Sequence, residues 1–201
     1  MKTLGGGYMD NEEKVTLWTR QHKKSLEDLK TTGAIRIKRE HLEEKFDEIT
    51  DYIVYLYNWF VNAAEKFVRR PEGVEFPVWC SVSEENMLRP TIDEIVYVLE
   101  VDKKDIIYFD GSKWDYVLNH HYVAKDERDA LEYSLELEAK GFDNSFSFIN
   151  EKISHFYPLE RKKVMDSWHR IFEIEKWDIF KVQANIWEIR ADMIKDIIYY
   201  D

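Results

Sequence analysis

Cysteine is nearly absent from this sequence, since Cys80 is the only one among 201 residues. A single thiol cannot form a disulfide within the chain, which excludes the small secreted folds that disulfides hold together. A reduced, cytoplasmic protein is the simplest expectation. Long apolar runs are missing too, and without about eighteen consecutive apolar residues the sequence predicts no membrane span.

Positive charge is in short supply. Lysine and arginine number 29 against 40 aspartates and glutamates, which gives a formal net charge of −11. A negatively charged surface repels the phosphates of nucleic acids and anionic lipid head groups. We therefore expect neither nucleic acid nor a membrane as a partner, although a local basic patch can persist within a negative total.

Familiar catalytic and phosphate-binding motifs are also missing. The sequence has no Gly-x-Gly-x-x-Gly, no phosphate-binding loop and no Gly-x-Ser-x-Gly. Gly5-Gly6-Gly7 lies within residues 1–14, which lack the apolar core of a signal peptide and are expected to form a flexible leader. The adjacent His120 and His121 would point in different directions on a helix and the other histidines are scattered, so no metal site is predicted.

Apolar and aromatic side chains, by contrast, are abundant. Hydrophobic residues make up 44% of the chain and aromatic residues 15%. This composition excludes intrinsic disorder, which requires few aromatic and few apolar side chains. The length fits one domain, so residues 15–201 are expected to form a single globular domain.

Alternation of apolar and polar residues predicts strands at Val15–Arg20, Phe76–Val82 and Phe180–Ile189. The nearly continuous apolar run Ile95–Val101 predicts a central strand that is covered on both faces. Shorter extended pieces are expected near residues 34–37 and 106–109. Because the three alternating segments all carry tryptophan, we expect them to share one sheet.

Helical spacing predicts one long helix from about Glu40 to Val68, and a shorter helix over residues 21–32 that ends at Gly33. Ser112 is expected to cap a short helix that carries Trp114. Further helices are predicted at residues 126–140, 144–153 and 159–174, with a final helix that carries Ile194, Ile197 and Ile198. The predicted fold class is α+β, a small mixed or antiparallel sheet of sequence-distant strands surrounded by helices.

Tryptophan-anchored segments recur along the chain. Each indole buries a large apolar surface and has one N–H that needs a partner, so each segment is expected to fix a junction in the core. In sequence order the six segments are Leu-Trp-Thr-x-Gln at residues 17–21, Tyr-x-Trp at 57–59, Pro-Glu-Gly-Val-x-x-Pro-x-Trp at 71–79, Trp-x-x-Val-Leu-Asn at 114–119, Ser-Trp-x-x-Ile-Phe at 167–172 and Gln-Ala-x-x-Trp-Glu at 183–188.

These six segments, in this order, resemble a bacterial family known as domain of unknown function thirty-eight forty-one. The resemblance covers nearly the whole chain after the leader, and the family brings no established activity with it. Members usually have Pro-Asp-Leu-Arg after the middle strand, where this chain reads Met87-Leu88-Arg89-Pro90-Thr91. The family's aspartate thus has no counterpart within this segment.

A candidate binding cleft follows if the three tryptophan-bearing strands are neighbours. Polar side chains of the early, middle and late strands would then converge, and Trp79 could stack on a ligand. The predicted ligand is a nucleotide or nicotinamide adenine dinucleotide (NAD). The residues expected to line the cleft are Trp18, Thr19, Gln21, Trp79, Gln183 and Glu188.

Glu188 is the candidate catalytic residue. Alternation places this carboxylate at the edge of an apolar strand face, where its pKa can be perturbed as an acid or base requires. The order of elements also resembles the ADP-ribosyltransferase architecture, in which a late-strand glutamate binds ribose and stabilises the oxocarbenium-like centre as nicotinamide leaves. The structural alternative is that Glu188 marks the end of the strand and either caps it or pairs with another residue there.

Asn119 is a further candidate for ligand binding, because Trp114 could stack on a base and Asn119 offers a donor and an acceptor. The alternative is an ordinary helix that buries Trp114 and ends at Asn119. Tyr52, Tyr55 and Tyr57 flank the apolar stripe of the long helix and could form a homodimer face. Two functions thus remain open: a nucleotide-binding, transferase-like enzyme, and a binding or regulatory module that acts through protein contacts.

Overall fold

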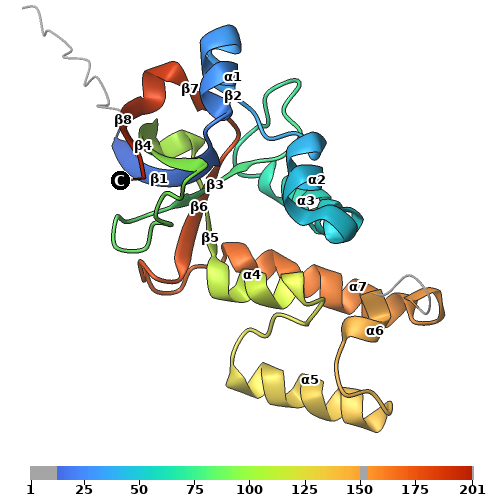
Figure 1. Ribbon diagram of the computed structural model, residues 1–201. Helices are drawn as coiled ribbons and strands as arrows, with labels where there is room; N and C mark the ends of the chain where they lie inside the picture. Colours follow the sequence, from blue (N-terminus) through green and yellow to red (C-terminus); the bar gives the residue numbers. More distant parts are fainter. Residues whose placement is uncertain (1–12, 150–153, 201) are drawn as a thin grey trace, which may run out of the picture.

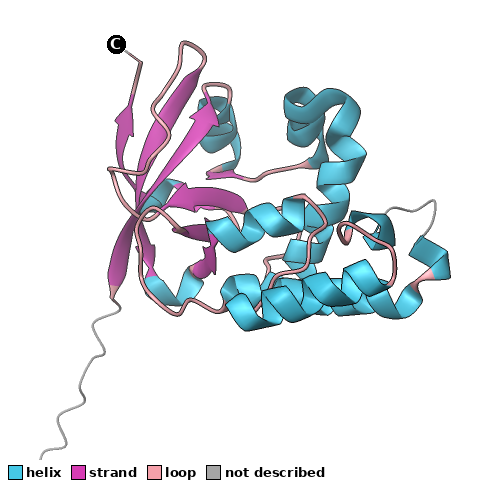
Figure 2. Cartoon of the chain, turned by 90° about the horizontal axis from the view of Figure 1, so that it is seen from below, coloured by secondary structure: helices cyan, strands magenta, loops and turns pink. Residues whose placement is uncertain are grey.

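The structure is a computed structural model that describes residues 13–149 and 154–200. Its centre is a six-stranded antiparallel sheet with the order β5-β6-β3-β1-β4-β8 (Figure 1). Helices cover the sheet, and seen from below the strands lie on one side of the molecule with most of the helices on the other (Figure 2). The predicted α+β class is confirmed.

The three strands predicted from tryptophan-bearing segments are neighbours, as the sequence predicts, although Trp187 lies just beyond the end of the last of them. They are β1 (Lys14–His22), β3 (Val78–Ser81) and β6 (Val182–Ile186). The antiparallel register places Trp18 opposite Ser81, and Ser81 opposite Gln183. The remaining strands of the sheet are β4 (Glu94–Asp102), β5 (Ile107–Asp110) and β8 (Ile194–Ile198).

The last strand corrects the sequence prediction, because the segment that carries Ile194, Ile197 and Ile198 forms edge strand β8 rather than a helix. β-Branched isoleucine favours extended backbone, and the free edge of β4 supplies the hydrogen-bonding partner that an isolated strand lacks. The late strand is also shorter than predicted. It ends at Ile186, and Ile189–Arg190 forms the separate strand β7, which pairs with β2 (Ala34–Ile35).

The helix predicted from Glu40 to Val68 is two helices, α2 (Arg39–Phe46) and α3 (Thr50–Ala64). The break lies at Asp47, whose φ of 46° is incompatible with a continuous right-handed helix. Aspartate tolerates this conformation better than most residues, and the Thr50 hydroxyl donates a hydrogen bond of 2.7 Å to the Asp47 carbonyl at the break. A short 3₁₀ turn, η1 (Asp47–Ile49), joins the two helices.

Four of the other helices show what begins or ends them. Helix α1 (Ser25–Thr32) ends at Gly33, which has a φ of 76° as expected of a left-handed cap. Helix α4 (Gly111–Leu118) is capped by Asp110, whose carboxylate accepts from the backbone N–H groups of Ser112 and Lys113, so Ser112 is not the cap. Asp126 caps α5 (Glu127–Ala139), and Pro158 begins α7 (Pro158–Ser167).

The predicted helix over residues 159–174 tightens after α7 into a 3₁₀ turn, η4 (Trp168–Phe172). Helix α6 (Phe146–Ile149) is the described part of the helix predicted at residues 144–153, and the rest of that prediction lies outside the described residues. None of the helices that the structure describes is long and apolar enough to cross a membrane.

Two hydrophobic cores flank the sheet. On the face that carries Cys80, residues of β1, β3, β4 and β6 pack against α1, β2 and β7. On the face that carries Trp79, strands β3 and β5 pack against α3, α4 and η4, with Phe60 and Trp168 fully buried. We call these the Cys80 face and the Trp79 face below.

Candidate functional site

The residues predicted to line one cleft lie on both faces of the sheet. Successive side chains of a strand point to opposite faces, and directly paired residues share a face. Trp18, Ser81 and Gln183 form a row across β1, β3 and β6 on the Trp79 face. Thr19 lies on the Cys80 face, because it pairs with the core residue Tyr97 and stands two residues from Leu17, which is buried in the same core.

Thr19 and Gln21 stabilise the Cys80 face rather than join this row. The hydroxyl of Thr19 donates to the backbone carbonyl of Trp79 at 2.8 Å, which ties β1 to β3. Gln21 Nε2 donates to the Thr19 hydroxyl at 2.8 Å. The structure therefore brings Trp18, Trp79 and Gln183 to one face and places Thr19 and Gln21 on the other.

Glu188 lies beyond the end of β6 and forms an ion pair with Arg36. Its Oε2 atom accepts from Arg36 Nε at 2.8 Å, and its side chain is 13% exposed. Arg36 follows β2, and Ile189 next to Glu188 begins β7, so the pair closes the end of the small β2–β7 sheet. This is the pairing that the structural interpretation of Glu188 predicts.

Trp79 is the centre of an aromatic layer between the sheet and the helices. Its ring centroid lies 5.1–5.3 Å from those of Tyr57, Phe60, Phe109 and Trp114. Its indole N–H is buried and has no hydrogen-bond partner among the described residues. Burial also raises the pKa of Tyr57 to about 12, which keeps its phenol neutral.

Asn119 and Trp114 have the roles of an ordinary helix end. Trp114 is buried in the aromatic layer. Asn119 is exposed, and its Nδ2 atom donates to the carbonyl of Asp115 at 2.8 Å, which satisfies a carbonyl of the last turn of α4. The structure thus gives Asn119 a local partner and places no other predicted site residue beside it.

The chain after α4 is clamped by side chains from several helices. Trp168 Nε1 donates to the carbonyl of His121 at 2.8 Å, and the Ser167 hydroxyl accepts from the N–H of Val123 at 2.9 Å. Ser145 donates to the carbonyl of His120 and accepts from the N–H of Tyr122, both at 3.0 Å. These bonds connect the Ser-Trp motif to the segment that directly follows the motif ending at Asn119.

His120 is held in this clamp with a φ of 56°. Its ring is buried against Tyr52, Phe146 and Trp168, and neither ring nitrogen has a hydrogen-bond partner among the described residues. Burial, together with the neighbouring His121, lowers the pKa of His120 to about 4. The imidazole is therefore neutral near pH 7 and serves as an apolar ring in the core.

A groove between α3 and α7 is a site that the sequence pattern did not reveal. It has a volume of about 420 Å³, within the range of small-molecule sites. Trp59 of α3 forms one wall, where its half-buried indole contacts the rings of Trp168 and His169. Arg161, Met165 and His169 also line the groove.

In an otherwise acidic chain, the net positive charge of this groove comes from Arg161. Arg161, Lys162, His155 and His169 line it together with one carboxylate, Asp166, which is paired with Lys162. The guanidinium of Arg161 donates to the Tyr55 hydroxyl at 3.3 Å and forms no ion pair with any residue that the structure describes. Partial burial and the nearby Lys66 lower the pKa of His169.

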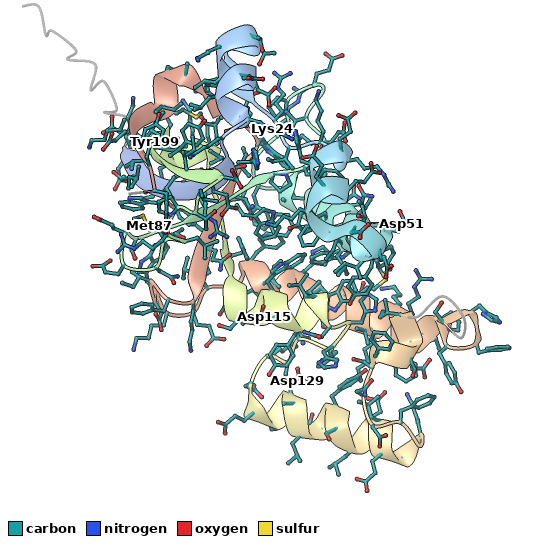
Figure 3. All side chains as sticks on the ribbon, in the orientation of Figure 1. Lys24, Asp51, Met87, Asp115, Asp129 and Tyr199 are labelled. Carbon is teal, nitrogen blue, oxygen red and sulfur yellow. The ribbon has the colours of Figure 1, made fainter. Side chains whose placement is uncertain are left out.

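A second hollow, of about 390 Å³, lies on the other side of α7. Its cations already have carboxylate partners, since Arg170 pairs with Asp129 and Lys163 pairs with Glu136. Asp129 also accepts from the Tyr122 hydroxyl, and Figure 3 shows it on the side of α5 that faces the rest of the molecule. The second hollow therefore offers an anion less unpaired charge than the groove.

Within residues 13–149 and 154–200, no group of three or more His, Cys, Asp or Glu side chains is placed to hold a metal ion. The molecule is thus an α+β domain in which tryptophan motifs join an antiparallel sheet to a layer of helices. The family model described as a domain of unknown function (DUF3841) matches residues 16–195, and the chain belongs to this family. No curated protein and no solved structure matches the chain significantly.

Proposed function

We propose that this protein binds a nucleotide in the groove between α3 and α7. Trp59 would contact the base, and Arg161 would bind the phosphate. The observation that carries the proposal is the guanidinium of Arg161, which lines the same groove as the Trp59 indole and has no carboxylate partner in the part of the chain that the structure describes. Most other arginines that the structure describes are near a carboxylate, as Arg20, Arg36 and Arg170 are.

The chemistry of the groove suits a phosphorylated aromatic ligand. A guanidinium presents a planar fork of donors that matches phosphate oxygens, and an indole face attracts flat rings. His169 and the exposed Lys162 add donors at the rim. A negative total charge does not prevent such binding, because the anion meets the local field of the groove at short range.

The transferase interpretation, with NAD between the strands and Glu188 as catalytic residue, has less support. Arg36 holds the Glu188 carboxylate at 2.8 Å, and Thr19 and Gln21 point away from the face that carries Trp79 and Gln183. We therefore favour a ligand-binding module over an enzyme. The cytoplasm remains the proposed compartment, because the single cysteine, Cys80, is a free thiol.

Titration calorimetry with AMP and ATP tests the proposal, with Arg161→Gln as the diagnostic variant. A charge-assisted hydrogen bond contributes about 1.5–3 kcal/mol, so the variant should bind about ten- to a hundredfold more weakly. The matched control is Arg190→Gln, because Arg190 of β7 pairs with Asp192 and lies outside the groove. If neither nucleotide binds, or if both variants bind as the unaltered protein does, the proposal is wrong.

A further inference from the structure

Helix α5 turns a regular stripe of side chains to the solvent. The helix lies at the outer edge of the molecule (Figure 1), and its inward face packs through the buried Tyr133 and Leu137. Leu131 and Leu135 lie one turn apart on the outward face, where they are 61% and 56% exposed. Exposed leucines at this spacing form a continuous ridge on a helix.

Arg128 and Glu138 extend this ridge at its two ends. The steps from Arg128 to Leu131, Leu135 and Glu138 are three, four and three residues, which is the spacing of the a and d positions of a coiled-coil seam. At 100° per residue, the four side chains fall within one narrow stripe, on the opposite side of the helix from Tyr133 and Leu137. The tyrosines considered for a dimer face from sequence lie elsewhere, since Tyr52, Tyr55 and Tyr57 pack against the core around Trp168 and Trp79.

We propose that this seam pairs with the same seam of a second copy, in antiparallel orientation. A twofold axis on the outward side of α5, level with residue 133 along the helix, would set Leu131 against Leu135 of the second copy, and Leu135 against Leu131. The same register sets Arg128 against Glu138 of the second copy at both ends, so the charges of the seam are complementary to themselves. In antiparallel helix pairs, an a position of one helix packs against a d position of the other, as in this register. A twofold dimer brings the same surface patch of both copies together, so this patch must be complementary to itself.

A second copy fits better than an unrelated partner because the seam carries one positive and one negative end residue, Arg128 and Glu138. In the antiparallel orientation each of these residues faces the opposite charge of the other copy. Arg128 forms an exposed ion pair with Glu132 of its own helix. Exposed ion pairs contribute little stability, so replacing this pair by one with Glu138 of the second copy costs little. The helix has 13 residues and is about 20 Å long, so the interface is small and the dimer reversible. The two acidic chains repel each other, which makes association strongest where salt screens that repulsion.

Sedimentation velocity over a wide concentration range, at about 0.15 M salt, measures the association directly. The unaltered protein should shift from monomer to dimer, and Leu131→Asn should weaken dimerisation by at least about tenfold, the effect of removing a central apolar contact. Leu88→Asn is the matched control, because Leu88 is also 61% exposed and lies in a loop away from α5. Circular dichroism checks that each variant remains folded.

Charge exchange tests the register. Arg128→Glu and Glu138→Arg should each weaken the dimer, because like charges then meet at both ends of the seam. The double variant restores opposite charges across the axis and should recover most of the lost affinity. A monomer at every concentration, an equal effect of Leu131→Asn and Leu88→Asn, or a double variant as weak as the singles would each overturn the proposal.

Discussion

Ser145 offers the sharpest test of the clamp on the chain after α4. Its hydroxyl is the single group that satisfies both the carbonyl of His120 and the N–H of Tyr122, each at 3.0 Å. The side chain is only 2% exposed, so water cannot simply replace it. Ser145→Ala removes one oxygen atom and leaves two buried backbone groups without this partner.

The expected cost follows from those two groups. An unsatisfied buried donor or acceptor costs about 1–3 kcal/mol, and alanine itself fits the space that serine leaves. Partial relaxation of the loop should recover some of this loss, so we expect Ser145→Ala to lower the free energy of unfolding by about 2–4 kcal/mol. A loss of this size is a large share of the stability of a typical domain.

Urea denaturation followed by circular dichroism measures this loss. The midpoint should fall while the slope stays constant, because the amount of surface exposed on unfolding does not change. Ser134→Ala on the exposed side of α5 is the matched control and should remain within about 0.5 kcal/mol of the unaltered protein. A cost of Ser145→Ala as small as that of Ser134→Ala would refute the account of the clamp.

Two further predictions concern titration and the strand end. The pKa of His120 is lowered to about 4 in the folded protein, so the unfolded chain takes up the proton first as the pH falls, and His120 should cost stability progressively between about pH 6.5 and pH 4. His120→Asn, which tolerates the positive φ, should flatten this part of the stability profile in melts at several pH values, and an unchanged slope would contradict a buried neutral imidazole. Glu188→Gln should lower the stability by no more than about 1 kcal/mol through loss of the Arg36 pair and leave AMP binding intact in calorimetry. A hundredfold loss of nucleotide binding or of any nucleotide-dependent activity in this variant would instead favour the transferase interpretation.

The sheet could be predicted from sequence because period-two alternation is a local signal. β1, β3 and β6 are neighbours as expected, although β6 ends at Ile186 and not at Ile189. The prediction was wrong at Ile194–Ile198, because the apolar residues there fit both helical and strand periodicity. Only pairing with the free edge of β4 decides that this segment is a strand. The break at Asp47 was missed because the helical spacing of apolar residues continues from α2 into α3. The interruption lies in the backbone alone, at the positive φ of Asp47.

The cleft was harder to predict than the sheet. Knowing that β1 and β3 are neighbours does not fix which side chains share a face, because a shift of one residue moves every side chain to the other side. The register places Trp18 opposite Ser81, and this single pairing sends Thr19 and Gln21 away from Trp79. The α3–α7 groove has no local pattern at all, since Trp59 and Arg161 meet only after the helices pack.

The motifs themselves now have a physical meaning that narrows the search for function. Trp168 and Trp187 donate their indole N–H groups to the carbonyls of His121 and Val68, and Trp114 is buried beside Trp79. These tryptophans join distant segments of the core, so their recurrence along the chain follows from folding alone. Trp59 differs, because it stacks on the same aromatic layer and also forms a wall of the groove that holds Arg161. Trp59 is therefore the residue that belongs both to the aromatic layer of the fold and to the groove proposed as the nucleotide site.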